Sequence, residues 1–201
     1  MIGIIDYGAG NLFSLQRALR HLGRPTRLVG SELDWSGLRG VILPGVGSFA
    51  AAMSGLRQKK LEKPLQDWLG AGRPFLGICL GLQLLFSGSA ESPQETGLDF
   101  FAGRCSLFEQ ARVPQLGWNR VSFTGPHFLW QGIADHSFFY YANSYHAPLN
   151  GGPPVLGRST HGRPFPAALA AGEICAVQFH PEKSAEPGLR LLANWSERCR
   201  P

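Results

Sequence analysis

The sequence lacks the features that mark secreted, membrane-spanning and metal-binding proteins. Its 201 residues include four cysteines, with no C-x-x-C motif and no pair at metal-ligand spacing, so we expect neither a disulfide framework nor a metal site. No apolar run approaches the ~20 residues that a membrane helix needs. The first residues do not have the shape of a signal peptide. We therefore expect a cytoplasmic protein that does not bind membranes.

The sequence also lacks long runs of residues with the same charge. The chain carries 19 Lys and Arg against 14 Asp and Glu, a net charge of +5, and no run of like charge forms a basic patch. We therefore expect no nucleic-acid partner. With 44% hydrophobic and 16% charged residues, the composition is that of a folded globular protein. The length predicts a single domain spanning residues 1–201.

The first ninety residues alternate short apolar runs with helical patterns. An apolar run that ends in a glycine-rich loop is typical of a buried strand, and leucines recurring at helical spacing predict a helix. This alternation indicates βαβ units and a parallel sheet. The expected strands cover 2–5, 27–30, 40–44 and 74–78, and the expected helices cover 12–22, 61–69 and 80–86, with a further helix capped by Ser48.

The pattern changes after residue 95, where shorter segments predict antiparallel strands and hairpins. The whole sequence thus predicts an α/β fold: an open, mostly parallel sheet with helices on both faces, and an antiparallel elaboration in the second half. The second half is expected to contain strands at 120–124, 137–147, 155–160 and 167–171, a buried strand at 174–179, and a helix at 188–198.

Cys79 stands out because it follows an expected buried strand, between two glycines in Gly77-Ile-Cys-Leu-Gly81. Gly-x-nucleophile-x-Gly is the pattern of a sharp strand-to-helix turn that exposes a nucleophile. The N-terminus of the following helix would favour the thiolate, and the Leu80 N–H would donate to an oxyanion. A buried core cysteine is the alternative interpretation. A redox site would need a resolving cysteine nearby, and none is present.

His180 is the candidate base, because it directly follows another expected buried strand. Pro181 stops that strand, so the chain must turn there. Glu182 then lies two residues further on, where its carboxylate can orient the imidazole. Cys79, His180 and Glu182 together predict a nucleophile, a base and an orienting group, the three roles of a catalytic triad.

Two segments, Gly77-Ile-Cys-Leu-Gly-Leu-Gln83 and Gln178-Phe-His-Pro-Glu-Lys-Ser184, resemble the class I (triad) glutamine amidotransferases. Their fold is flavodoxin-like. More narrowly, the chain is similar to the HisH subfamily, the glutaminase subunits of imidazole glycerol phosphate synthases. This narrower likeness rests on Asp6-Tyr-Gly-Ala-Gly-Asn-Leu12, Leu43-Pro-Gly-Val-Gly47 and Pro114-Gln-Leu-Gly-Trp-Asn119.

The resemblance implies hydrolysis of L-glutamine to glutamate and ammonia through a Cys79 thioester, without a cofactor. His180 would protonate the departing ammonia and then activate water, while Glu182 orients it. Asn143 departs from the family pattern, which often has His there, so we expect no side-chain role at 143. The backbone of Leu80, Val46 and Gly47 would form the oxyanion hole, and Gln83, Ser144 and Tyr145 would bind the substrate.

The resemblance also implies a partner, the cyclase subunit HisF, a (β/α)₈ barrel that receives the ammonia. It would use the ammonia to make imidazole glycerol phosphate and AICAR in histidine biosynthesis. Asn11, Trp118 and Lys183 would lie at the interface of this heterodimer. For Trp118 the alternative is a core aromatic, and for Lys183 an ordinary surface lysine. We further expect the Gly45–Gly47 loop to donate to the oxyanion only when the cyclase is bound.

Three other functions are compatible with parts of this pattern. The chain could be the glutaminase of another triad amidotransferase, such as that of pyridoxal phosphate or anthranilate synthesis; the Gly-Trp-Asn and Glu-Lys-Ser segments argue against this. It could be a stand-alone cysteine hydrolase of the same fold, against which Gln83 and the Gln-Phe-His-Pro-Glu segment argue. It could also be a binding module without activity, but the triad residues are all present.

Overall fold

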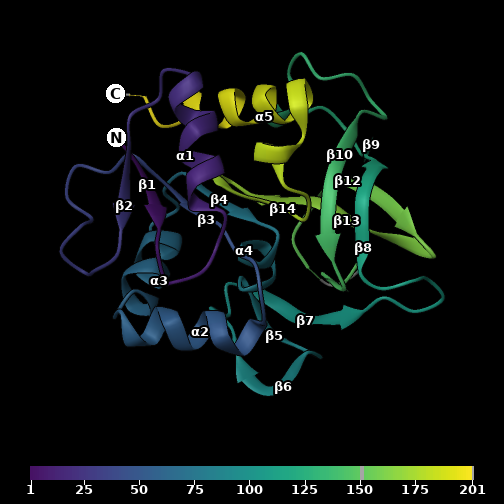
Figure 1. Cartoon of the computed structure of the whole chain (residues 1–201), viewed down its shortest axis with the longest axis horizontal. Coiled ribbons are helices and arrows are strands. Elements are labelled where there is room, and N and C mark those ends of the chain that lie inside the picture. Colours follow the sequence, from purple (N-terminus) through teal and green to yellow (C-terminus); the bar gives the residue numbers. More distant parts are fainter. Residues whose placement is uncertain (150–151, 201) are drawn as a thin grey trace.

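A central eight-stranded sheet organises the chain (Figure 1). The computed structural model describes residues 1–149 and 152–200. The strand order is β2-β1-β3-β4-β14-β13-β12-β9, and the five strands from β2 to β14 run parallel. These five are β1 (Ile2–Ile5), β2 (Thr26–Val29), β3 (Gly40–Leu43), β4 (Phe75–Ile78) and β14 (Ile174–Val177).

Helices cover both faces of this sheet, as expected (Figure 1). Successive strand residues point to opposite faces: Ile4 packs with α1 and α5, whereas Ile5 packs with α2 and α3. Both faces are therefore buried, which is why β1, β3, β4 and β14 read as continuous apolar runs. The helices are α1 (Leu12–His21), α2 (Phe49–Gln58), α3 (Glu62–Gly70) and α5 (Ala185–Glu197).

The antiparallel elaboration extends the sheet beyond β14. In the described residues, β13, β12 and β9 continue the sheet in alternating directions. Two smaller sheets, β10-β8 and β11-β7-β5-β6, lie beside it. The strands of this half are β5 (Phe86–Ser89), β6 (Ser92–Thr96), β7 (Phe101–Leu107), β8 (Gln115–Arg120), β9 (Ser122–Phe123), β10 (Phe138–Asn143), β11 (Tyr145–His146), β12 (Val155–His161) and β13 (Arg163–Ala171), and 3₁₀ helices lie at η1 (Phe128–Trp130) and η2 (Pro181–Lys183).

The predicted length of the helix at 80–86 is wrong. The helix α4 covers only Leu80–Gln83, and the chain then turns into β5. The carbonyls of Leu84 and Leu85 accept hydrogen bonds from Leu98, Phe100 and Phe101 instead of from a continuing helix. These tertiary hydrogen bonds override the apolar helical pattern of the sequence.

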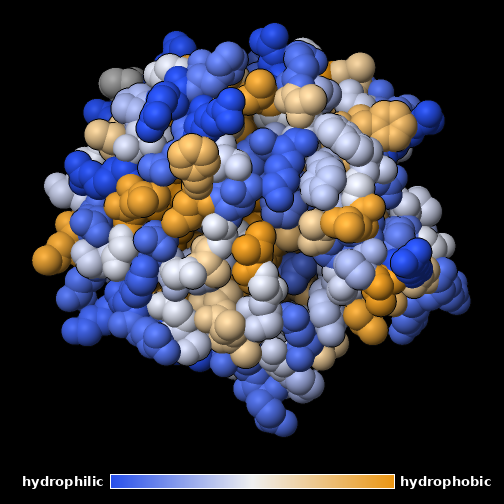
Figure 2. All heavy atoms as spheres, in the orientation of Figure 1, coloured by the Kyte–Doolittle hydropathy of each residue, from blue (hydrophilic) through white to orange (hydrophobic). Residues whose placement is uncertain are grey.

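The surface is polar with scattered apolar residues. Figure 2 shows hydrophobic side chains as separate groups among hydrophilic ones on this face of the molecule. Such scattering is usual on folded proteins. In the described part of the chain, no helix combines the length and the apolar character needed to cross a membrane.

Candidate active site

The turn at Cys79 is a sharp bend held by close packing. Cys79 has φ 55° and ψ −107°, a conformation that residues with side chains rarely adopt. Its N–H donates to Val177 O (2.8 Å), which ties the turn to β14. A Cβ on Gly77 would lie 2.7 Å from Gly81 O, and one on Gly81 would lie 1.8 Å from Leu43 O. Both glycines of the motif are therefore required by space, because a side chain at either position would clash with backbone atoms.

Strand β14 brings His180 to the same edge of the sheet. It pairs in parallel with β4, Val177 beside Ile78, so the residues after both strands emerge together. His180 Nδ1 is 2.9 Å from Glu182 Oε1, and both side chains are buried. Nε2 is buried too and has no hydrogen-bond partner among the described residues. The imidazole is thus held by one nitrogen while the other stays free for proton transfer.

Two opposing effects set the pKa of His180. Burial lowers the pKa, because it disfavours the imidazolium, but the nearby Cys79 sulfur and the Glu182 carboxylate outweigh burial and raise the pKa above its usual range. The arrangement therefore favours the imidazolium form of His180.

Ser184 braces this histidine, a role that the sequence does not indicate although the residue ends the Gln178–Ser184 segment. Its hydroxyl donates to His180 O (2.6 Å) and accepts from Tyr140 N–H (2.9 Å), and the side chain is fully buried. The N–H of His180 in turn donates to Tyr140 O (2.8 Å). A serine four residues after a candidate base is a weak signal that sequence alone does not resolve.

A cleft of about 250 Å³ opens at Cys79. It brings together residues expected to act on one substrate, including all three expected oxyanion-hole residues. Gly47 has φ +96° and open space around it, whereas a Cβ on Gly45 would meet Leu80 Cβ at 2.6 Å. The Gly45–Gly47 loop is therefore packed at one end and free at the other. The cleft is lined by Val46, Gly47, Cys79, Leu80, Gln83, Glu91, Pro114, Ala142, Asn143, Ser144 and Tyr145.

The expected substrate-binding residues meet one another across this cleft. Gln83 Nε2 donates to Tyr145 O (2.9 Å), so that carbonyl is already used within the fold. The Ser144 carbonyl accepts from Phe108 N–H (3.0 Å). In the described residues, the Ser144 hydroxyl and Gln83 Oε1 make no such bond, which leaves both available to a ligand.

The expectation of no side-chain role at Asn143 is wrong. Its Nδ2 donates to Tyr145 O (3.0 Å), while its Oδ1 is buried without a partner in the described residues. The side chain is 5% exposed. An amide can brace the strand turn between β10 and β11 from inside, without the ionisable ring that the family often has there.

Glu91 is the acidic group of the cleft, and no motif in the sequence points to it. Its Oε2 accepts from Phe49 N–H (2.8 Å) at the start of α2, which fixes the carboxylate. A fixed carboxylate in a small cleft can receive an ammonium group. Sequence reasoning missed Glu91 because it lies in the 80–96 region, where the sequence pattern does not predict the strands that the structure contains.

Two of the three expected interface residues, Trp118 and Lys183, lie against Tyr140. The Trp118 ring lies edge-on to Tyr140 (6.1 Å between centroids), and Lys183 Nζ is 5.7 Å from the centre of the same ring. Trp118 is 52% exposed, so it is no core aromatic. Asn11 precedes α1, which contacts η2, where Lys183 lies.

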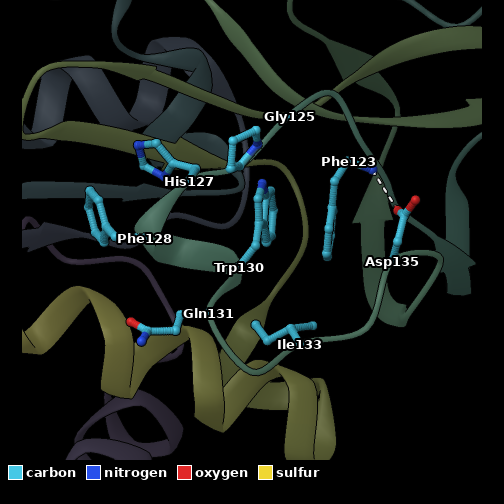
Figure 3. A pocket seen from close by; sticks show the side chains of 9 residues that line it. Phe123, Gly125, His127, Phe128, Trp130, Gln131, Ile133 and Asp135 are labelled. Carbon is cyan, nitrogen blue, oxygen red and sulfur yellow. Dashed lines mark hydrogen bonds between the residues drawn. The ribbon is translucent and has the colours of Figure 1, made fainter.

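A larger hollow, about 690 Å³, lies elsewhere, around η1 (Figure 3). Phe123 and Trp130 stack there (4.2 Å, 9°), and Asp135 accepts a hydrogen bond from Phe123 N–H. It shares no residue with the cleft and its lining contains no cysteine, and in the described residues its His127 and Asp135 make no hydrogen bond to each other. We therefore assign the chemistry to the smaller cleft. Within residues 1–149 and 152–200, no three His, Cys, Asp or Glu side chains gather as a metal site would require.

Comparison with known proteins adds a family match. The family model for class I glutamine amidotransferases matches residues 3–198. The chain is 42% identical over 198 residues to the imidazole glycerol phosphate synthase subunit HisH of Desulfitobacterium hafniense, covering 98% of this chain and 94% of that protein. It is 44% identical over 200 residues to the protein of the same description from Moorella thermoacetica (99% and 95%).

Solved structures show the same fold. A crystal structure described as a glutamine amidotransferase superposes with a TM-score of 0.79 at 20% identity, over 98% of each chain. The structure of PurLQS from Thermotoga maritima contains a chain that superposes with a TM-score of 0.73 at 16% identity, over 99% of this chain and 98% of the other.

Proposed function

The chain belongs to the class I glutamine amidotransferases, and on that premise we propose that it is the glutaminase subunit of an imidazole glycerol phosphate synthase. It hydrolyses L-glutamine to glutamate and ammonia as one glutaminase domain. The observation that carries the proposal is the cleft at Cys79, with a His180–Glu182 pair beside a nucleophile on a strained turn.

The reaction begins with the thiolate of Cys79. Its sulfur attacks the side-chain carboxamide carbon of glutamine, and the oxygen becomes an oxyanion that Leu80 N–H and the Val46–Gly47 backbone stabilise. The His180 imidazolium gives its proton to the departing nitrogen, so ammonia leaves and a thioester remains. Neutral His180 then takes a proton from water, and the hydroxide cleaves the thioester to glutamate and thiolate.

The other cleft residues select the amino-acid end of the substrate. Glu91, already fixed by Phe49 N–H, receives the α-ammonium group of glutamine together with Gln83 Oε1. The Ser144 hydroxyl and the nearby backbone bind the α-carboxylate. A cleft of about 250 Å³ fits one amino acid.

The ammonia is consumed by a partner, the cyclase subunit HisF, in a heterodimer. Exposed Trp118 beside Lys183 and Tyr140 supports this proposal, because aromatic and cationic side chains together are typical of interfaces. The four cysteines are free, which fits a reducing cytoplasm.

A glutaminase assay tests the proposal. The chain is mixed with glutamine, with and without the cyclase subunit and its nucleotide ligand, and glutamate release is measured. We expect release to rise when the liganded cyclase is present and to vanish with Cys79→Ala. Release that persists in Cys79→Ala would refute the thioester mechanism, and release from the isolated chain that equals the complex would refute control by the partner.

A further inference from the structure

We propose that Gln178 is a further catalytic residue, whose carboxamide N–H donates to the Cys79 sulfur and stabilises the thiolate. The inference deepens the proposed glutaminase function and rests on it. Gln178 immediately follows β14, and its side chain is fully buried (0% exposed). Its Nε2 is 3.7 Å from Cys79 Sγ, within hydrogen-bonding distance for sulfur.

A second glutamine fixes which way this carboxamide points. Gln83 Nε2 donates to Gln178 Oε1 (3.2 Å) and also to Tyr145 O (2.9 Å). The backbone carbonyl of Tyr145 can only accept, so Gln83 must present its NH₂ group on this side. The oxygen of Gln178 therefore faces Gln83, and its NH₂ group faces the sulfur.

The sulfur has few other donors. Ala142 O lies 3.9 Å from Sγ and can accept a proton from the thiol, but it offers nothing to a thiolate. The helix after Cys79 has only four residues, so its dipole supports the anion less than a full helix would. Gln178 thus supplies a neutral, buried N–H in addition to the charge of His180. Hydrogen bonds to an ionised acceptor are stronger than those to a neutral one, so this N–H favours the thiolate.

The same hydrogen bond acts in both halves of the reaction. When sulfur bonds to the substrate carbon it loses its negative charge, and the hydrogen bond from Gln178 weakens. When water cleaves the thioester, the C–S bond breaks, its electron pair returns to sulfur and the hydrogen bond forms again. Gln178 therefore stabilises the thiolate as attacking group before the reaction and as leaving group at its end.

Alkylation of Cys79 across a range of pH tests this directly. The full chain is treated with iodoacetamide, and modification of the Cys79 peptide is followed by mass spectrometry. The other three cysteines compete little, because burial raises the pKa of Cys175 and Cys199 to about 12 and raises that of Cys105 further. In Gln178→Met, which keeps the length but loses the N–H, the pH midpoint of alkylation should move up by about one unit.

Two further variants make the outcome decisive. Gln178→Glu keeps an oxygen for Gln83 and places a carboxylate beside the sulfur, so its midpoint should move up further than that of Gln178→Met. Gln131→Met changes an exposed glutamine immediately after η1 and should leave the midpoint unchanged. An unchanged midpoint in both position-178 variants, with circular dichroism showing folded protein, would overturn the proposal.

Turnover with the cyclase subunit gives a readout that a purely structural role would not move. At pH 7, kcat/KM of Gln178→Met for glutamine should fall by about 10- to 100-fold, mostly through kcat, and should recover partly as the pH rises. A loss of equal size at every pH would contradict the assignment. If wild-type protein releases no glutamate while the alkylation midpoint still shifts, the proposed function fails and the role of Gln178 at the thiolate stands.

Discussion

At Cys79 the backbone occupies a region that only glycine visits at low cost (φ 55°, ψ −107°). Strain of this kind costs about 1–3 kcal/mol and persists because the surrounding packing holds it. The strained residue is also the nucleophile of the proposed reaction. The strain therefore lowers the stability of the folded state at the turn that presents the Cys79 sulfur to the cleft.

Replacing Cys79 by Gly or by Ala separates this strain from the chemistry. Both variants lack the sulfur and should release no glutamate. The glycine variant should be more stable than the alanine variant by about 1 kcal/mol, because glycine adopts the turn without a Cβ clash. Urea unfolding of the two proteins measures the difference. Equal stabilities would mean that the turn is not strained.

A second prediction at this scale concerns Glu182, whose carboxylate helps to raise the pKa of His180. In Glu182→Gln the pKa of His180 should fall, since one hydrogen-bonded charge is removed. NMR titration of the imidazole should show a lower midpoint, and kcat should drop about 10- to 100-fold. Glu186→Gln, a change of an exposed neighbour on α5, should alter neither.

The same pair sets a pH dependence of stability. The pKa of His180 is raised in the folded state, so its contribution to folding is fully present below the ordinary histidine pKa of about 6.5 and is lost as the pH rises through the raised value. Glu182→Gln should therefore lower Tm more at pH 6 than at pH 10. A loss of Tm that is larger at pH 10 would have the wrong sign for this account.

At the scale of elements, β4, the turn and α4 form one tightly packed unit. A Cβ on Gly81 would lie 1.8 Å from Leu43 O, which belongs to the backbone of β3 and cannot move aside. Gly81→Ala should thus destabilise the fold by about 3 kcal/mol or more. Thermal unfolding tests this against Gly70→Ala at the end of α3, where a Cβ meets nothing within 4 Å. If both variants melt alike, this close packing does not hold the turn.

Much of this element structure could be predicted from sequence, and the failures have identifiable causes. β1, β3, β4 and β14 are buried on both faces and therefore read as apolar runs with clear ends. The secondary-structure prediction is wrong in the 80–96 region because Leu84 and Leu85 form hydrogen bonds with residues 98–101, and no local sequence pattern indicates such distant partners. The active site was likewise predictable only in part. Cys79 and His180 follow buried strands and lie in recognisable motifs, so sequence indicates their roles. Glu91 and Ser184 act through contacts that only the fold creates, so sequence does not indicate theirs.

At the scale of the whole molecule, the cleft and the expected interface residues come from elements that flank the carboxyl ends of the parallel strands. Trp118→Ala should weaken binding of the cyclase subunit by at least about tenfold, because exposed aromatics often dominate interface energies. Leu33→Ala, which removes an 85% exposed side chain from the loop after β2, is the matched control. Isothermal titration calorimetry measures both. Equal affinities for the two variants would place the interface elsewhere.

The position of β14 has a consequence for how the protein is made. This strand comes late in the chain but lies between β4 and β13, in the interior of the sheet. A nascent chain that has emerged only as far as β13 already carries Cys79 but still lacks His180 and the strand that sets the histidine beside the thiol. Because synthesis runs from the N-terminus, the ribosome delivers the base after the nucleophile. An unfinished chain therefore carries the thiol without the base, and the proposed hydrolysis of glutamine needs β14 and the residues after it.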